Sequence, residues 1–302
     1  FVSGSWTVSG RYALELIFKN NQSLCKKTIY LPIYNCPSTH YVIKKYFKKI
    51  IFYELYSNLK LKKKKFKKNS VLIFVNYFGH KCKFVFRKDL TIIEDLTHLM
   101  LDTIKIQKNR FYFASLRKFG VFNFGGWTNI INQKINKKLN NFLEKYRKKN
   151  FYYLSLKKKN LEIEHKLLNL LSREEKKIFR KKICITKKSI KCLTDISEKK
   201  IKLARKTNYL YLQKNIEIEY LKIPFRKNET PIFFFLKFFN IDERNRVRKI
   251  LNNNNIYCPI LWPLNSYDLS KFPHSKSLSE NTLAIPIDHR FSIRDMKYIL
   301  KV

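Results

Sequence analysis

The sequence predicts an α/β protein with a large domain built on a mostly parallel sheet and a smaller C-terminal α+β domain. Strand-like apolar runs alternate with helical patterns over residues 9–114, as expected when helices cover both faces of a parallel sheet. Residues 132–205 are helical in pattern and heavily charged, and about the last ninety residues return to mixed structure. We therefore expect a large domain over residues 1–200, including a helical extension, and a small domain over residues 201–302.

The expected elements of the N-terminal half begin with a turn at Gly10, which leads into a helix with Leu14, Ile17 and Phe18 on one face. A second helix is expected from about Thr39. The expected strands are Thr28–Pro32, Ile50–Leu55, Val71–Tyr77, Leu90–Glu94 and Phe111–Ala114, and Lys60–Lys68 is expected to be a solvated basic loop.

In the C-terminal part, we expect strands at Pro231–Phe239 and Ile256–Leu261 and a helix at Asp242–Leu251. The closing helix begins at Ser292, because Ser292 and Asp295 have the spacing of a capping box.

The composition bounds the class of protein. Of 302 residues, 45% are hydrophobic and 15% aromatic, which is enough for a core. The formal net charge of +42 by itself favours nucleic-acid binding. However, Phe, Tyr, Ile, Asn and Lys are all abundant while only 6 residues are Gly, a joint bias typical of a low-GC genome. Because the lysines are also spread along the chain, we interpret most of the charge as compositional and expect only non-specific adhesion to nucleic acids.

The six cysteines form no C-x-x-C pair and have no histidine at metal-ligand spacing, so we expect free thiols, no metal site and a cytoplasmic location. The most apolar window, Pro231–Phe239, is too short to cross a bilayer, and no charged-then-apolar leader opens the chain. The first residue is Phe1 rather than Met, from which we expect a truncated N-terminus.

Two segments could bind and activate a small molecule. Gly10, Arg11 and Tyr12 open the first expected helix, where free backbone N–H groups suit a phosphate, although such a Ser-Gly pair is more often only a helix cap. Asp95 ends an apolar strand and precedes His98 by three residues; an acid in this position also commonly caps the next helix.

The most informative segment is residues 114–126, in which Lys118 follows a strand-like run and precedes glycines 120, 125 and 126. In so basic a chain, a single lysine is by default an exposed surface residue without a function. Lys118 differs from the other lysines in its neighbours, which are Ser115, the glycines and several aromatic residues. A lysine and an acid at neighbouring strand ends suit pyridoxal phosphate, which forms a Schiff base with the amine while the acid keeps the pyridine nitrogen protonated.

In order along the chain, these segments resemble the DegT-type sugar aminotransferases, which are fold-type I pyridoxal-phosphate enzymes. Ser9-Gly-Arg-Tyr-Ala-Leu14 resembles their Gly-Thr-x-Ala-Leu phosphate turn, and Ile93-Glu-Asp-Leu-Thr-His98 resembles their Ile-Glu-Asp-x-x-Gln. Ser115-Leu-Arg-Lys118 with Gly125-Gly126 is similar to their Schiff-base lysine and trailing glycine pair. Further similarities are the Pro-aromatic loop at Leu31–Cys36, the Val-His-x-x-Gly strand end at Val75–Gly79, the Arg-x-x-Asn helix at Arg205–Leu210 and the closing strand at Leu278–Asp288.

The resemblance implies a pyridoxal-phosphate aminotransferase that moves an amino group from glutamate to a keto sugar nucleotide and works as a homodimer. It implies that Lys118 holds the cofactor and moves protons, and that Asp95 faces the pyridine nitrogen. The cofactor-binding residues that it implies are Gly10, Arg11, Tyr12, Tyr34, Asp95, His98, Ser115 and Lys118.

The chain departs from the family's pattern at several positions. His98 replaces the usual Gln, Asn76 stands where the family often has His, and Ser115 lies only three residues before the lysine. Tyr34 is the expected aromatic residue over the ring, with Cys36 as the alternative in the nearest register. Two other interpretations stay open, a catalytically drifted relative and a basic nucleic-acid-binding protein.

Overall fold

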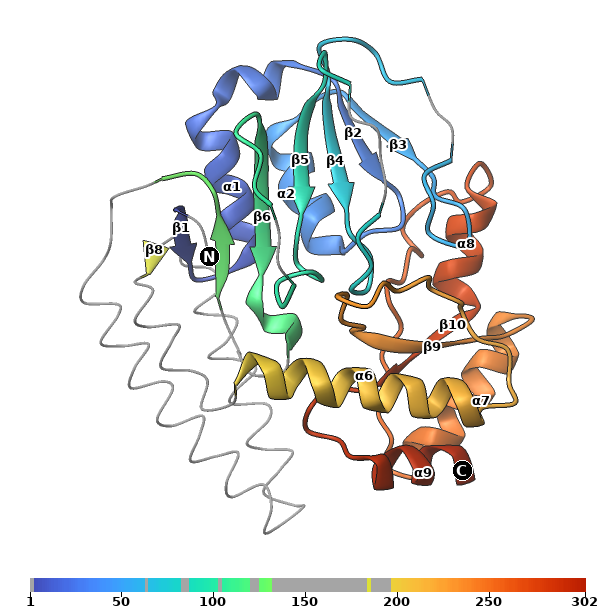
Figure 1. The fold of residues 1–302 in the computed structure, drawn as a ribbon. Helices are drawn as coiled ribbons and strands as arrows, with labels where there is room; N and C mark the ends of the chain where they lie inside the picture. Colours follow the sequence, from blue (N-terminus) through green and yellow to red (C-terminus); the bar gives the residue numbers. More distant parts are fainter. Residues whose placement is uncertain are drawn as a thin grey trace, which may run out of the picture. The chain divides into compact units, whose positions relative to one another are not determined.

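The computed structural model describes residues 3–62, 65–82, 87–102, 105–119, 125–131, 184–185 and 197–302 (Figure 1). The chain divides into two compact units, each built from two separate stretches. Unit 1 combines Phe1–Asn20 with Phe113–Asp195, and unit 2 combines Asn21–Tyr112 with Ile196–Val302. The division expected at residue 200 stays a prediction.

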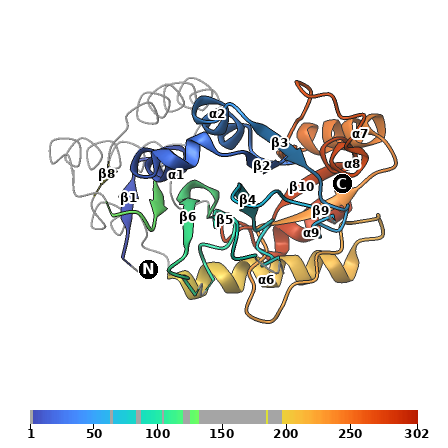
Figure 2. The same cartoon turned by 90° about the horizontal axis from the view of Figure 1, so that it is seen from above.

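Unit 2 contains the parallel part of the sheet, with strands in the order β3-β2-β4-β5. Every residue of β2 (Ile29–Pro32) and β4 (Val71–Val75) is buried, as is typical of central strands in a parallel sheet covered on both faces. The neighbouring strands are β3 (Ile50–Tyr53) and β5 (Thr91–Asp95). Figure 2 shows that α2 (Pro37–Tyr46) covers one face of these strands. The short helix η1 (Gln22–Lys26) leads into β2.

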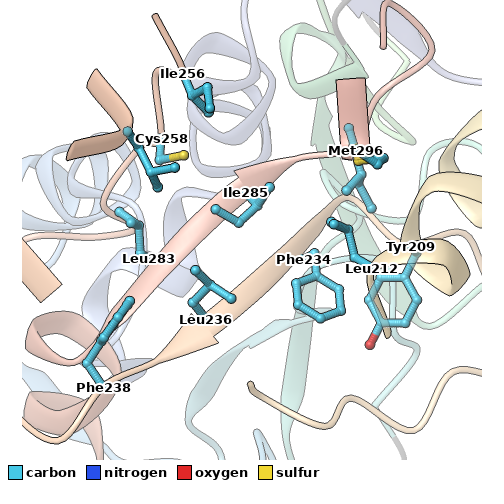
Figure 3. Close-up of a cluster of buried hydrophobic side chains, with 12 residues drawn as sticks. Tyr209, Leu212, Phe234, Leu236, Phe238, Ile256, Cys258, Leu283, Ile285 and Met296 are labelled. Carbon is cyan, nitrogen blue, oxygen red and sulfur yellow. The ribbon is translucent and has the colours of Figure 1, made fainter. Parts of the chain in front are cut away.

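The C-terminal part of unit 2 has its own hydrophobic cluster (Figure 3). A two-stranded antiparallel sheet pairs β9 (Phe233–Lys237) with β10 (Thr282–Pro286). Side chains from these strands pack with side chains of α6 (Glu198–Asn215) and α9 (Ile293–Lys301), including Phe234, Ile285, Leu212 and Met296. The other helices here are α7 (Ile241–Asn253) and α8 (Pro273–Glu280).

Unit 1 contains antiparallel strands in the order β6-β7-β1-β8. Strand β6 (Arg110–Ser115) begins in unit 2 and ends in unit 1, where the short helix η2 (Leu116–Phe119) follows it. The other strands are β1 (Ser5–Thr7), β7 (Gly126–Thr128) and β8 (Cys184–Ile185). Helix α1 (Gly10–Asn20) buries nearly all of its first nine residues, and its Tyr12 and Leu16 pack on Cys184.

The α/β class is confirmed, and so are the two helices expected in the N-terminal half, the helix at Asp242–Leu251 and the helix that begins at Ser292. At the start of α9, the Ser292 N–H donates to Asp295 Oδ2 at 2.7 Å, as in the predicted capping box, and the Ser292 hydroxyl donates to the same oxygen at 2.7 Å. The strand expected at Ile256–Leu261 was wrong. Residues 256–261 pair with no strand, and the true partner of β9 is β10. Most of the helical region expected over 132–205, and Gly120, lie outside the described residues.

Candidate cofactor site

The carboxyl ends of the parallel strands in unit 2 bring three predicted site residues to one edge of the sheet. Tyr34 lies just after β2, Asp95 is the last residue of β5, and His98 lies in the turn after β5. Val75 of β4 pairs with Asp95, and the Asn76 N–H donates to the Asp95 carbonyl at 3.3 Å. Ligands of open parallel sheets bind outside the carboxyl ends of the strands, so this edge is where a site is expected.

Asp95 is only 6% exposed, and its carboxylate is held in a defined orientation. Its Oδ1 accepts a hydrogen bond from the Thr97 N–H at 2.8 Å, which closes the turn after the strand. The neighbouring Glu94 points to the opposite face of the strand, where its Oε1 accepts from Asn76 Nδ2 at 2.8 Å. Burial raises the pKa of Glu94, while the contacts with Asn76 and Arg110 counteract part of this effect. The two adjacent acids therefore have separate surroundings.

His98 is buried, and its tautomer is fixed by one hydrogen bond. The Phe78 N–H donates to His98 Nδ1 at 3.1 Å. A backbone N–H can only donate, so Nδ1 must accept, and the proton of the neutral ring is on Nε2. The imidazole is also nearly parallel to the rings of Phe78 (5.5 Å between centroids, 25°) and Trp262 (5.8 Å, 2°). His98 therefore presents Nε2–H in a restrained ring.

Tyr34 is fully buried among aromatic side chains. Its hydroxyl donates to the Leu261 carbonyl, and its own carbonyl accepts from the Tyr77 hydroxyl at 2.7 Å. Its ring is stacked on Tyr77 (6.0 Å, 15°) and tilted against Trp262 (5.2 Å, 59°). Burial raises the pKa of the Tyr34 hydroxyl, which keeps it protonated as a donor. These contacts show how the ring is held, and its expected place over a cofactor stays a prediction.

Unit 1 brings together the three segments around Lys118 that the sequence singles out. The first turn of α1 packs directly on the end of β6, because a Cβ built on Gly10 would lie 2.7 Å from Ser115 Cβ. A Cβ on Gly126 would lie 2.5 Å from the Ser9 carbonyl carbon, so the glycine pair passes against the same turn. Only glycine permits both approaches.

Lys118 itself lies in η2, directly after β6, and is half-buried. The Leu116 N–H donates to the Gly125 carbonyl at 3.0 Å, and the Gly125 N–H donates to the Val8 carbonyl at 2.9 Å. Gly125 has a φ of +113°, a conformation that other residues rarely adopt. The start of η2, the short helix that carries Lys118, is therefore linked through Gly125 to Val8, just before α1.

The first turn of α1, where a phosphate is expected to bind, is capped by Ser9. Ser9 caps the helix, since its Oγ accepts from the Tyr12 N–H at 3.2 Å and its carbonyl accepts from the Ala13 N–H at 3.0 Å. An anion bound through the Tyr12 N–H would have to replace the Ser9 hydroxyl. Arg11 is exposed in the same turn.

The predicted site residues thus form two groups, one in each unit. Unit 1 holds Gly10, Arg11, Tyr12, Ser115 and Lys118, and unit 2 holds Tyr34, Asp95 and His98. The meeting of Lys118 with Asp95 in one site stays a prediction. The sequence analysis missed Trp262, whose indole contacts Tyr34 and His98 of unit 2. The rarity of tryptophan, with only 3 in the chain, was the one sequence signal that could have drawn attention to it.

The described residues include no group of three or more His, Cys, Asp or Glu side chains that could hold a metal ion. Within these same ranges, none of the helices combines the length and apolarity that a membrane span requires. The five cysteines in the described ranges are free.

Comparison with solved structures decides the architecture. Spr1654 of Streptococcus pneumoniae, assigned as a sugar aminotransferase, superposes in its PMP form with a TM-score of 0.68 at 15% identity, over 99% of this chain and 86% of that one. A DegT DnrJ EryC1 StrS aminotransferase of Brucella abortus gives 0.60 at 14% identity, over 99% and 84%. The chain has the DegT-type aminotransferase fold. The sugar aminotransferase CalS13 of Micromonospora echinospora shares it with a TM-score of 0.64 at 10% identity, over 99% and 86%. No family model and no curated protein matches the sequence.

Proposed function

We propose that the protein is a pyridoxal-phosphate-dependent aminotransferase acting on a sugar substrate. One observation carries the proposal: in unit 1, the glycine-cradled N-terminus of α1 packs against the strand end that leads to Lys118. A helix N-terminus that could bind an anion, packed on the strand that leads to a half-buried lysine, would suit a cofactor that has both a phosphate and an aldehyde. The shared fold with solved sugar aminotransferases supports the same function.

In this proposal, residues of the two units would each hold a different group of the cofactor. The N-terminus of α1 and Ser115 would hold the phosphate, with the Gly10 and Gly126 approaches keeping the turn close to the strand. Asp95, nearly buried at the end of β5, would hold a proton at the pyridine nitrogen. His98 would donate its Nε2–H to the phenolic oxygen, since Nδ1 is already an acceptor.

When bound, the cofactor withdraws electrons from the substrate carbon that carries the amino group. The role of the chain is then to place proton donors and acceptors. Lys118 would attach the cofactor through its amine and, once displaced, would move a proton as general base. In the finer form of the proposal, glutamate is the donor, a keto sugar nucleotide is the acceptor, and the enzyme is a cytoplasmic homodimer.

A spectrum of the purified protein tests the proposal. We expect a visible absorption band on addition of pyridoxal phosphate, and a mass increase at Lys118 after borohydride reduction. Lys118→Arg should lose both, whereas Lys199→Arg, at an exposed lysine of α6, should keep both. A wild-type protein that stays colourless would refute the proposed aminotransferase function and favour a relative that has lost its catalytic activity. If the band forms, release of 2-oxoglutarate from glutamate with candidate keto sugar nucleotides tests the substrates.

A further inference from the structure

The indole of Trp262 lies against two of the residues expected to surround the cofactor. It is parallel to the imidazole of His98, with 5.8 Å between centroids and 2° between planes, and it is tilted against Tyr34 at 5.2 Å. Trp262 is 5% exposed. It belongs to the C-terminal stretch of unit 2, far in sequence from both of its neighbours.

The backbone on both sides of the indole is fixed. The Leu261 carbonyl accepts the Tyr34 hydroxyl, and the Trp262 carbonyl accepts the Ser279 hydroxyl at 2.8 Å. These two hydrogen bonds anchor consecutive peptide units and so fix the backbone that carries the indole, while the ring itself is held by its burial against Tyr34 and His98.

The indole Nε1–H of Trp262 is buried and has no hydrogen-bond partner among the described residues. An indole nitrogen can only donate, and a buried donor without an acceptor is unfavourable enough that proteins rarely keep one. The ring is also not in a purely apolar setting, since it lies against the imidazole of His98, one of the residues expected to bind the cofactor. These two facts point to an acceptor supplied by a ligand.

We propose that Trp262 binds the ligand of this site and donates its Nε1–H to an oxygen of pyridoxal phosphate or of the adduct formed on it. The inference rests on the proposed function, and it adds a residue from the C-terminal stretch to the binding site. Trp262 would act beside His98, so the two N–H donors would share the oxygen-bearing edge of the ligand.

The indole proton can be observed directly. The chain has 3 tryptophans, so ¹⁵N-labelled indoles give three resonances, and Trp6→Phe and Trp127→Phe assign that of Trp262 by elimination. On titration of the wild type with pyridoxal phosphate, we expect the Trp262 indole proton to move downfield and to exchange more slowly with solvent. An unchanged exchange rate while the visible band forms overturns the inference.

A matched substitution separates the hydrogen bond from the packing of the ring. Trp262→Phe keeps an aromatic ring on His98 and removes the donor, so we expect the dissociation constant for pyridoxal phosphate to rise about 3- to 10-fold. Trp6→Phe, at a half-buried position of β1, should leave it unchanged. An affinity in Trp262→Phe equal to that of the wild type overturns the hydrogen bond even if the resonance shifts. If the wild type binds no pyridoxal phosphate, the proposed function and this inference fail together; if only the Trp262 signals fail, the proposed function stands.

Discussion

The contact between α1 and β6 makes Gly10→Ala the most informative substitution. The added Cβ would lie 2.7 Å from Ser115 Cβ, 3.0 Å from Ser115 Cα and 3.2 Å from the Ala114 carbonyl oxygen. Ordinary contacts begin at 3.4 Å, so the helix N-terminus and the strand end must separate by about 0.7 Å. None of the three atoms is the far end of a flexible side chain that could turn aside.

The expected cost follows from this displacement. Overpacking of this kind lowers the free energy of unfolding by about 1–3 kcal/mol. The effect on activity should be larger, since misplacing a positioning group by close to 1 Å can reduce the rate about 100-fold. We therefore expect Gly10→Ala to weaken pyridoxal-phosphate binding under conditions in which urea unfolding shows that the variant is still folded.

The assay is a double-mutant cycle with Ser115→Gly, followed by urea unfolding and by titration with pyridoxal phosphate. Ser115→Gly alone should cost about 1 kcal/mol because glycine weakens a strand. The double variant removes the closest of the three contacts and should be more stable than the sum of the single effects by about 1 kcal/mol. A Gly10→Ala protein as stable as the wild type, or a cycle with no coupling, would refute the proposed packing of the helix on the strand.

Three further outcomes can be checked by urea unfolding. Burial raises the pKa of Asp102 to about 6 from 3.8, so the folded protein binds this proton more tightly than the unfolded chain, and stability should fall as the pH rises from about 4 to about 6. The full shift corresponds to about 3 kcal/mol, which partial exposure reduces to about 1–2 kcal/mol, and Asp102→Asn should abolish this pH dependence. Tyr34→Phe should cost about 1 kcal/mol by leaving the Leu261 carbonyl without its donor, and an equal stability would contradict that bond. Glu229→Gln should cost about 1.5–3 kcal/mol, because the Glu229 carboxylate accepts from His80 Nδ1 and from two backbone N–H groups; a smaller loss than that of Tyr34→Phe would show that the carboxylate is not needed.

The elements that the sequence predicted well have local signals. Apolar runs of five buried residues mark β4, and the capping residues Ser292 and Asp295 mark the start of α9. These features depend on residues close together in the chain.

The elements that were missed depend on distant partners. Strands β1, β7 and β8 have two or three residues each, too few for a periodic pattern. Helix α8 has its first N–H groups satisfied by Glu54, whose Oε1 accepts from the His274 N–H at 2.8 Å and from the Ser275 N–H at 3.2 Å. No local pattern reveals a cap that lies 220 residues away.

The wrong strand and the missed tryptophan have a common cause. Residues 256–261 are apolar enough for a strand, but Pro259 lacks an N–H, and its carbonyl makes a single contact with the Ala284 N–H at 3.3 Å. The segment instead holds Trp262 against His98. Aromatic contacts between residues so far apart depend on tertiary structure and leave no periodicity in the sequence.

Unit 2 has a consequence for synthesis on the ribosome, because its two stretches are separated by most of unit 1. The hydroxyl of Tyr34 and the imidazole of His40 each find their partners, Leu261 and Tyr267, 227 residues later. At about 5–20 residues per second, the first stretch waits about 10–45 s for those partners to emerge. During this interval Tyr34 and His40, both buried in the folded protein, lack these partners, so a growing chain that stalls before residue 261 is expected to be bound by chaperones.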